Sequence, residues 1–357
     1  MSEMISKPSE GRRKPSHNER FLRWSKKSAD IINAPYPNKE TNFIDWDDPR
    51  YAIKENDRRW ILPEGFDLGA HEWYQTLPEK KKIEIGMKRI ANVVRTGLEF
   101  EQALISGISV RTQLLTHPKY YEEFRSFTHE AEEEQRHILM FNELNHRIGV
   151  RTYGSPNWFR TITPLIGAAA RKAPIGFYAS VLAGEEPIDH VQRQLSAMHE
   201  DFHRAKEKEE REKGIIIPEE EKDLIHPLVY KVMKVHVEEE ARHIGIAEEL
   251  LDKYMPAMSE TQLKLFAKIY PAITRAGINA TLLPSDETLR YMGVPKQVAK
   301  EVWFDSDYGR QTLRDLSFRA RRRAEKLGLR DERLLGKTGK KVWELCGIDG
   351  STARQRN

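Results

Sequence analysis

The 357-residue sequence has very little cysteine: Cys346 is its single copy. One cysteine excludes a disulfide-bonded scaffold and a cysteine-rich zinc site, and it indicates a reducing compartment. The chain also lacks any apolar run of the roughly 18 residues that a membrane span needs, and its polar, basic N-terminus has no apolar secretory core. We therefore predict a cytoplasmic protein without membrane contact.

An excess of charge of one sign is missing as well. Lysine and arginine number 59 against 55 aspartate and glutamate, a formal net charge of +4, which gives no indication of nucleic-acid binding. No strand-like alternation of any length stands out, and no G-x-G-x-x-G motif between a strand and a helix indicates a nucleotide site. We predict an all-α fold that holds neither flavin nor nicotinamide.

The composition along the chain predicts three parts. Residues 1–38 are rich in Ser, Lys, Arg, Pro and Asn, and we interpret them as a flexible basic arm. Residues 39–335 form the helical domain, beginning with an irregular aromatic segment. Residues 336–357 read as a polar, mobile C-terminal tail.

Helical periodicity and helix-stop residues predict the elements of the domain. We expect Pro164 and Pro174 to divide the third helical region, and Pro187 to kink or restart it. A charged surface excursion at 203–223 precedes the fourth helix. The expected helical regions are 78–108, 118–148, 158–200, 227–254, 259–282, 295–304 and 309–327.

The fourth long helix carries the most unusual motif, His236-x-x-x-Glu240-x-x-His243. Steps of four and three residues return to the same helix face, so two imidazoles and one carboxylate point the same way. Apolar residues such as Val232 and Leu250 share this face. Ionisable side chains in an apolar seam are costly unless they are paired or bind a metal.

Similar anomalies occur in the three earlier long helical regions. Glu101 lies in the apolar stripe of the first, whereas Glu99 is expected to face solvent. Glu134 and His137, spaced as Glu-x-x-His, lie in the stripe of the second, and Glu185 lies on the apolar side of the third. The neighbouring carboxylates are interpreted as facing away from the seam: Glu130, Glu132, Glu133 and Glu186.

The order is therefore Glu, Glu-x-x-His, Glu, Glu-x-x-His, the ligand order of ferritin-like four-helix bundles that bind two iron ions. Bridging carboxylates offset the repulsion between two close cations, while imidazoles leave coordination positions open for dioxygen. We predict such a bundle with additional helices and a di-iron carboxylate site in its core. The candidate ligands, with His236 as an addition to the basic pattern, are Glu101, Glu134, His137, Glu185, His236, Glu240 and His243.

His-x-x-x-Glu-x-x-His on the last bundle helix resembles the para-aminobenzoate N-oxygenase family of di-iron enzymes. The segments Glu101–Ile105, Glu134–His137 and Ala183–Glu185 resemble its other ligand segments, and Leu313–Ser317 with Glu325–Leu329 resembles its C-terminal end. The resemblance covers about residues 77–330 and assigns the same seven ligands. The long gap between Glu185 and His236, which contains the excursion, and Pro187 depart from the family.

The resemblance implies a monooxygenase in which a diferrous site binds dioxygen, forms a peroxo-diferric species and oxidises an amine nitrogen towards hydroxylamine and nitro products. Electrons would come from a ferredoxin or a separate reductase. The basic run 319–323 is a candidate docking site for such a carrier, although a solvated helix face is the simpler interpretation.

The sequence does not identify the substrate, and it does not determine whether the protein forms a homodimer. Val93 and Phe100 beside the first ligand offer no partner for an aminobenzoate carboxylate. Arg314 is a candidate for that role, but an exposed structural arginine is the favoured interpretation.

Alternatives with the same ligands are a di-iron C–H hydroxylase or desaturase and a ferritin-like iron-oxidising protein. A metal-free helical interaction protein is a further alternative. Manganese at one of the two positions is compatible with this ligand set, because metal supply as well as ligand type decides loading.

Overall fold

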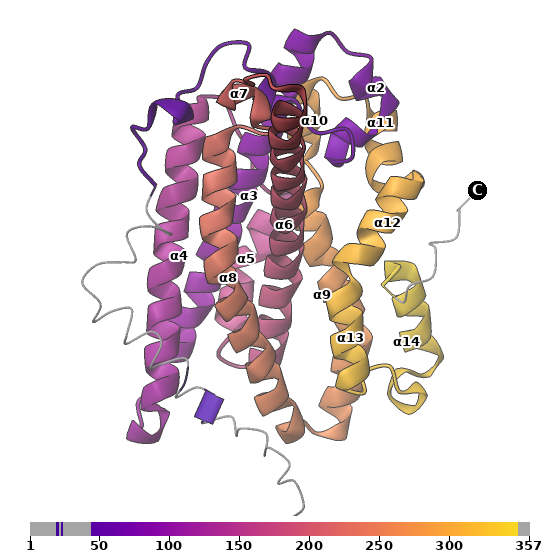
Figure 1. The fold of residues 1–357 in the computed structure, drawn as a ribbon. Helices are drawn as coiled ribbons and strands as arrows, with labels where there is room; N and C mark the ends of the chain where they lie inside the picture. Colours follow the sequence, from indigo (N-terminus) through magenta and orange to yellow (C-terminus); the bar gives the residue numbers. More distant parts are fainter. Residues whose placement is uncertain (1–18, 21–22, 24–43, 349–357) are drawn as a thin grey trace, which may run out of the picture.

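The computed structural model describes residues 19–20, 23 and 44–348. In this part of the chain every regular element is a helix (Figure 1). The predicted arm 1–38 therefore lies almost entirely outside the described residues, and so does the end of the predicted tail. No described helix combines the length and the apolar character that crossing a bilayer requires.

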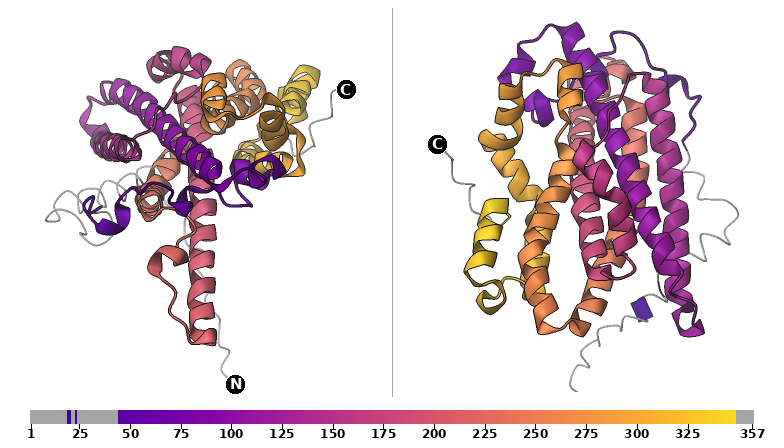
Figure 2. Two further views of the ribbon diagram at one scale, coloured as in Figure 1. Left: turned by 90° about the horizontal axis from the view of Figure 1, so that it is seen from above. Right: turned by 180° about the vertical axis from the view of Figure 1, so that it is seen from behind.

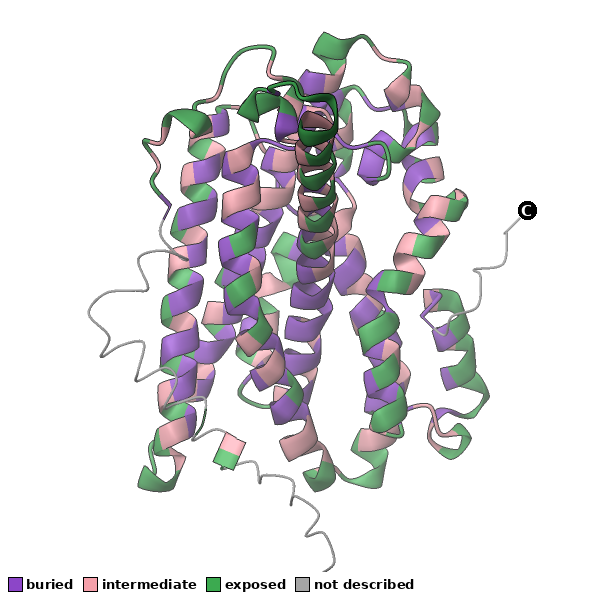
Figure 3. Cartoon of the chain, viewed as in Figure 1, coloured by how far each residue is buried: buried purple, intermediate pink, exposed green. Residues whose placement is uncertain are grey.

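Four long helices form the bundle (Figure 1). Neighbours in sequence pack in pairs, the first with the second and the third with the fourth, and further contacts between the pairs close the bundle. Their buried faces turn inward and their exposed faces outward (Figure 3). The four helices are α3 (Glu79–Thr112), α4 (Tyr121–Ile148), α6 (Pro174–Lys213) and α8 (Pro227–Tyr254).

Proline and glycine set the ends of these helices. Pro174 and Pro227 are the first residues of α6 and α8, where a missing N–H breaks no helical hydrogen bond. Gly149 and Gly214 end α4 and α6 in the left-handed conformation, with φ of 71° and 62°. The predicted ends of the second and fourth helices are thus confirmed.

One of the two prolines expected to divide the third helical region does so. Pro174 begins α6 after the end of α5 (Asn157–Ala169), whereas Pro164 lies within α5, and Pro187 lies within a single continuous α6. Helix α6 also runs on to Lys213, so the first half of the predicted excursion at 203–223 belongs to this helix. Its last turns and the loop to α7 (Glu219–Lys222) project from the body of helices (Figure 2, left). Packing on both sides of α6 outweighs the local cost of the proline.

Two helices cover the gap between α3 and α6 from outside. Helix α5 contacts α3 and α6, and α9 (Glu260–Leu282) packs along α6 (Figure 2, right). Gly277 allows the close approach of α9, because a Cβ there would lie 2.2 Å from the carbonyl oxygen of Ala183. This contact is next to Glu185 in the sequence, so α9 supports the α6 segment that carries a candidate ligand.

Shorter helices complete the domain. The predicted tail is not mobile throughout, because α14 begins before it and packs on α9, burying Trp343 and donating a hydrogen bond from its indole to the carbonyl of Ala267 at 3.1 Å. The remaining elements are 3₁₀ helices η1 (Pro49–Tyr51), η2 (Arg58–Trp60), η3 (Asp67–Ala70), η4 (Pro118–Tyr120) and η5 (Met255–Ala257), the π-helix η6 (Glu301–Asp305), and the α-helices α2 (Glu72–Gln75), α10 (Asp286–Met292), α11 (Lys296–Lys300), α12 (Asp307–Leu316), α13 (Phe318–Lys326) and α14 (Glu332–Cys346).

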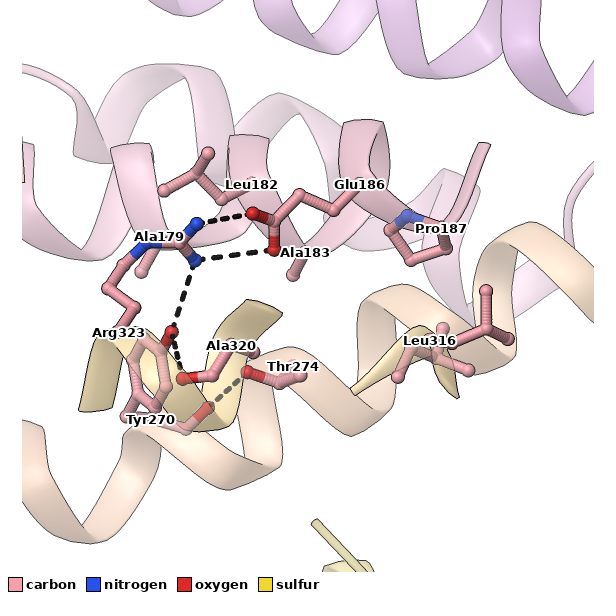
Figure 4. Close-up of a pocket in the computed structure, with 11 residues that line it drawn as sticks. Ala179, Leu182, Ala183, Glu186, Pro187, Tyr270, Thr274, Leu316, Ala320 and Arg323 are labelled. Atoms are coloured by element: carbon pink, nitrogen blue, oxygen red, sulfur yellow. Dashed lines mark hydrogen bonds and ion pairs between the residues drawn. The ribbon is translucent and has the colours of Figure 1, made fainter. Parts of the chain in front are cut away.

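Helix α13 is tied to the bundle by an ion pair. Glu186 points away from the bundle interior toward Arg323 (Figure 4). The guanidinium of Arg323 also donates to Glu248 at 2.7 Å. Tyr270 lies beside this pair and donates to the carbonyl of Ala320 at 3.2 Å. The prediction that Glu186 faces away from the seam is correct, and the basic run is partly structural because its Arg323 is buried.

Candidate metal centre

All seven predicted ligands lie in the core of the bundle, and none is more than 1% exposed. Helix α3 supplies Glu101 and α6 supplies Glu185. The Glu-x-x-His pairs come from α4 and α8, and the latter also supplies His236. Each position lies on the inward face of its helix because the spacing of three or four residues repeats close to the helical period.

Six of the seven residues form two overlapping groups. In each group the candidate ligand atoms all lie within 4.8 Å of one another. His137 and Glu240 belong to both groups, and Glu185 belongs to neither, although it is buried beside them. The groups are Glu101, His137, His236 and Glu240, and Glu134, His137, Glu240 and His243.

Imidazole nitrogens face carboxylate oxygens at the distances expected around a shared cation. Nδ1 of His137 lies 2.9 Å from Glu134 Oε2 and 3.3 Å from Glu240 Oε1. Nδ1 of His243 lies 3.2 Å from Glu240 Oε1 and 2.6 Å from Glu134 Oε1. Two ligand atoms at right angles, each about 2.1 Å from one ion, would lie roughly 3 Å apart.

The other ring nitrogens of these histidines donate to carboxylates in a reciprocal pattern. Nε2 of His243, on α8, donates to Glu133 of α4 at 2.8 Å. Nε2 of His137, on α4, donates to Glu239 of α8, also at 2.8 Å. Donation from Nε2 leaves the lone pair on Nδ1 directed at the centre, the usual way in which an outer carboxylate orients a metal-binding imidazole.

His236 is held in the opposite orientation. Its Nδ1 donates to Gln192 Oε1 at 2.9 Å, and its Nε2 faces Glu101 Oε1 at 3.0 Å. The ring of Phe141 packs against it, with the two ring centroids 4.9 Å apart. Nε2 of the extra histidine is therefore its candidate ligand atom, on the Glu101 side of the centre.

Burial and mutual repulsion shape the protonation of the carboxylates. Burial raises the pKa of Glu101 and Glu185 well above the ordinary value, and neighbouring Glu134 and Glu240 raise it further. Burial and Glu240 act the same way on Glu134, but His243 and His137 bring its pKa down to about 2. Burial lowers the pKa of His236 to about 4. A neutral imidazole and ionised carboxylates are the forms that bind metal.

Unsatisfied oxygens are the clearest sign that these residues fit a metal. One buried oxygen of each of Glu101, Glu185 and Glu240 accepts no hydrogen bond. Buried polar atoms without partners are rare in folded proteins, and three of them converge here from three helices. Oxygen and imidazole donors suit iron or manganese.

Three neighbouring carboxylates differ from the sequence prediction. Glu99 is buried and accepts from the backbone N–H of Ser155 at 2.8 Å, which fixes the loop after α4. Glu133 is buried by its contact with His243, and Glu130 is buried with its pKa raised to about 8 by the loss of solvent. Glu132 is exposed as predicted. Helices α3 and α4 each contact several partners, so they bury a wider arc than one apolar stripe indicates.

Two cavities adjoin the centre. The first, of about 70 Å³, lies on the His236 side and is lined by Val93, Phe141, Gln192 and the ion pair of Arg89 with Asp67. The second, of about 160 Å³, lies between α3, α5, α6 and α9 and has Glu185 in its wall. We call the second the α5–α9 cavity. Arg314 lines neither cavity and donates to Gln311, so the structural interpretation of this arginine holds.

The helical bundle and its buried carboxylate–histidine cluster define a ferritin-like protein with a site suited to a pair of metal ions. The sequence model of p-aminobenzoate N-oxygenase AurF matches residues 17–203 and 217–328. The chain therefore belongs to the p-aminobenzoate N-oxygenase family, an oxygenase family. The unmatched residues 204–216 are the projecting end of α6 and the loop after it.

Relatives extend the likeness to mycobacterial proteins. The uncharacterized proteins MT0908 of Mycobacterium tuberculosis and Mb0909 of Mycobacterium bovis are each 37% identical over 314 residues, which is 88% of this chain and 84% of each relative. No solved structure matches the chain. The family thus supports an oxygenase that uses dioxygen and a small molecule.

Proposed function

We propose that the protein is a two-iron monooxygenase that inserts oxygen at the nitrogen of an amine, most simply an arylamine. The observation that carries the proposal is the pair of overlapping ligand groups that share His137 and Glu240. Membership of an N-oxygenase family supports the reaction type. His236, which is additional to the usual Glu and Glu-x-x-His ligand set, distinguishes this centre from the basic ferritin-like pattern.

Two groups of residues would form the metal site, those that bind the ions and those that orient the imidazole rings. Glu101, Glu134, Glu185 and Glu240 hold the ions and offset their repulsion. Nδ1 of His137 and His243 and Nε2 of His236 complete the two positions, and Glu133, Glu239 and Gln192 fix the ring orientations. Two iron ions bound there supply the redox chemistry that activates dioxygen.

The surroundings of the centre exclude water. The candidate ligands are at most 1% exposed, the ring of Phe141 lies between them and the cavity on the His236 side, and Glu185 alone among them lines the α5–α9 cavity. A dry site protects reactive oxygen chemistry from competing protons. One turnover converts an amine R–NH₂, dioxygen, two electrons and two protons into R–NHOH and water, the electrons coming from an external ferredoxin or reductase.

Iron reconstitution followed by product analysis tests the proposal. Protein loaded anaerobically with ferrous iron should hold about two ions per chain, and mass spectrometry should detect an arylhydroxylamine after oxygen and an arylamine are supplied with a reductant. Glu134→Ala and His243→Ala should lose both the metal and the product. Elemental analysis also determines whether manganese takes one position.

Other results would select the alternatives. A product hydroxylated or desaturated at carbon would show that the protein is a di-iron C–H hydroxylase or desaturase and not an N-oxygenase. Many irons per chain without an organic product would indicate iron oxidation and storage. Unchanged metal content in both variants would contradict the ligand assignment, and a chain that binds no metal would leave a helical interaction protein.

A further inference from the structure

A second set of buried polar side chains lies outside the metal centre, on the part of α4 that precedes its candidate ligands. Glu123, Ser126 and Glu130 follow one another at steps of three and four residues. They therefore share the inward helix face that also carries Glu134. All three are buried, at 4%, 2% and 4% exposed. A line of polar groups thus runs inside the bundle from the start of α4 to the centre.

This polar line crosses an apolar region. Apolar residues from all four bundle helices pack together at this end, among them Ile108, Phe127, Leu182 and Leu250. Glu130 Oε2 and Ser126 Oγ have no hydrogen-bond partner among the described residues. Burial raises the pKa of Glu130 to about 8. A buried carboxyl without a partner costs free energy that an apolar residue in its place would save, which indicates a functional role.

Glu123 connects the line with the rim of the bundle, at the lower end in Figure 1. It accepts hydrogen bonds from the hydroxyl of Tyr254 at 3.2 Å and from Lys253, both in the last turn of α8. Arg111 of α3 donates to the same hydroxyl. The side chain of Lys253 is 23% exposed. The outer end of the line therefore meets groups that contact solvent.

Glu130 forms the inner end of the line, although it belongs to neither ligand group. It precedes the candidate ligand Glu134 by four residues, about 6 Å along the helix axis. One water molecule or a rotation of the flexible Glu130 side chain spans such a gap. The titratable groups that act on the Glu130 carboxyl are His243 and Glu240 of α8, Glu133 and Glu134 of α4, and Tyr178 of α6.

The centre needs a route for protons because its surroundings exclude water. In the proposed reaction each turnover consumes two protons, yet no candidate ligand is more than 1% exposed. A second hydrogen-bonded connection runs from His243 through Glu133 to the partly exposed Arg242. A guanidinium keeps its proton in proteins, so this connection orients the imidazole and relays no protons. The line on α4 consists instead of carboxyl and hydroxyl groups, which exchange protons.

We propose that Glu130 is the proton donor to the metal centre and is supplied from the rim through Glu123 and Ser126. The O–H bond of Glu130 breaks and its proton passes toward the centre, by way of a water molecule or Glu134. The carboxylate that remains regains a proton from Ser126, whose hydroxyl takes up another from the side of Glu123. No electrons move along this line. The inference rests on the proposed function, because it needs a centre that consumes protons.

Infrared difference spectroscopy tests whether Glu130 holds a proton. The spectrum of the metal-free wild type at pH 7, minus that of Glu130→Gln, should contain the carbonyl band of a protonated carboxyl. The band should fade as the pH rises past about 8. Glu132→Gln, the same change at an exposed position of α4, should remove no such band. A missing band in the Glu130→Gln difference would overturn the proposal, because an ionised Glu130 has no proton to give.

Oxidation of the ferrous-loaded protein by oxygen tests proton delivery without any amine. Two ferrous ions, dioxygen and two protons give two ferric ions and hydrogen peroxide. Stopped-flow absorbance should show this reaction slowed at least about tenfold in Glu130→Gln, with a larger solvent deuterium isotope effect. Glu130→Asp should recover part of the rate, and Glu132→Gln should react as the wild type does. Elemental analysis verifies that each variant still holds about two ions.

Ser126→Ala is the second test variant, two helical turns before Glu134 and therefore distant from the metal. It should slow the oxidation less than Glu130→Gln does and should keep the metal. An unchanged rate and isotope effect in Glu130→Gln would overturn the proposal. If Glu130→Gln binds no metal, an unchanged rate in Ser126→Ala overturns it.

Product analysis separates the proton route from the reaction at nitrogen. Slowed oxidation in Glu130→Gln, with no hydroxylamine formed from an arylamine by the wild type, would support the route and contradict the proposed function. Hydroxylamine formed by Glu130→Gln at the wild-type rate would overturn the route and leave the proposed function intact.

Discussion

At the scale of single residues, each candidate ligand glutamate of the Glu-x-x-His pairs is preceded by a second glutamate that contacts the opposite helix. Glu133 accepts a hydrogen bond from His243, and Glu239 accepts one from His137. The repeated segment Glu-Glu-x-x-His on α4 and α8 thus encodes both a candidate ligand and the hydrogen-bond partner of the other histidine. Each of the two helices therefore supplies the glutamate that orients the histidine of the other.

This exchange predicts that Glu133→Gln and Glu239→Gln weaken metal binding without removing a ligand. Loss of an outer carboxylate at a metal-bound histidine costs about 10–100-fold in affinity. Competition of each variant with a chelator for ferrous iron measures the loss. Glu132→Gln, at an exposed position beside Glu133, is the control and should bind as the wild type does. Wild-type affinity in both test variants would show that the imidazoles need no orienting partner.

The repetition was also the signal that the sequence interpretation missed. A single amphipathic stripe places Glu133 and Glu130 outside the apolar seam of α4, and the structure buries both. Hydropathy of one helix does not report how many neighbours it has, and α4 is covered by α3 and α8. Comparing the two Glu-Glu-x-x-His segments with each other would have identified Glu133 and Glu239 as a matched pair.

At the scale of elements, close contact of α6 and α9 supports the third ligand segment. Gly277 of α9 lies against the backbone of Ala183, two residues before Glu185. Gly277→Ala should push the helices apart and lower the free energy of unfolding by about 1–3 kcal/mol, as overpacking does. Chemical denaturation measures this change.

Gly176→Ala is the matched control, since a Cβ there has its nearest neighbour 4.0 Å away. Removing a helical glycine without a clash should leave stability unchanged or raise it by up to about 1 kcal/mol. Equal effects of the two substitutions would contradict the importance of the α6–α9 contact.

Helix α8 begins at a buried histidine that must stay neutral. His226 Nδ1 accepts from the N–H of Leu228 at 3.3 Å, and its ring stacks on Trp60 at 4.7 Å. Burial, reinforced by Arg59, lowers its pKa to about 4. Below about pH 6.5 the unfolded chain binds a proton at this histidine that the folded chain excludes. The contribution of His226 to the free energy of unfolding therefore falls as pH drops toward 4, by about 3 kcal/mol in total.

Denaturation curves of the wild type and His226→Asn between pH 7 and pH 4 test this dependence. Asparagine still caps a helix but does not titrate in this range. The stability difference between the two proteins should therefore change across the window, the wild type losing its advantage as the pH falls. A difference that is constant with pH would show that His226 does not titrate with folding.

The sequence predicted the elements more reliably where a stop residue was present. Gly149 and Pro227 defined the end of α4 and the start of α8 correctly. The restart of α6 expected at Pro187 is wrong, because the contacts of α6 with α8 and α9 are long-range and leave no local pattern. The same holds for α14, whose glycines and lysines read as a mobile tail although Trp343 is buried against α9.

At the scale of the whole molecule, the buried carboxylates that converge on the centre lower the stability of the metal-free bundle. Without metal, the raised pKa of Glu101 and Glu185 means that the folded state must hold protons or bear unpaired charges. The unfolded carboxyls ionise near pH 4.3. The folded chain then binds more protons than the unfolded chain, so its free energy of unfolding falls as pH rises above that value.

Metal binding should reverse this loss, because a ligand that binds only the folded state stabilises it. In the His226→Asn variant, which lacks the opposite pH dependence of His226, we expect the metal-free protein to melt at a lower temperature at pH 7 than at pH 5. Ferrous or manganous ions should raise the melting temperature at pH 7 by several degrees, and a chelator should restore the lower value. Scanning calorimetry under anaerobic conditions measures all three states.

Glu185→Gln separates the destabilisation of the metal-free protein by its buried carboxylates from the stabilisation that metal binding gives. Glutamine keeps the shape of the side chain and removes one of four converging carboxylate charges, so the metal-free variant should melt a few degrees above the metal-free wild type. It should also gain less from added metal, because a ligand is lost. Glu132→Gln, far from the repulsion on an exposed surface, should alter neither temperature. A lower melting temperature of metal-free Glu185→Gln would mean that Glu185 stabilises the fold itself, and its place at the centre would then be structural rather than a concession to metal binding.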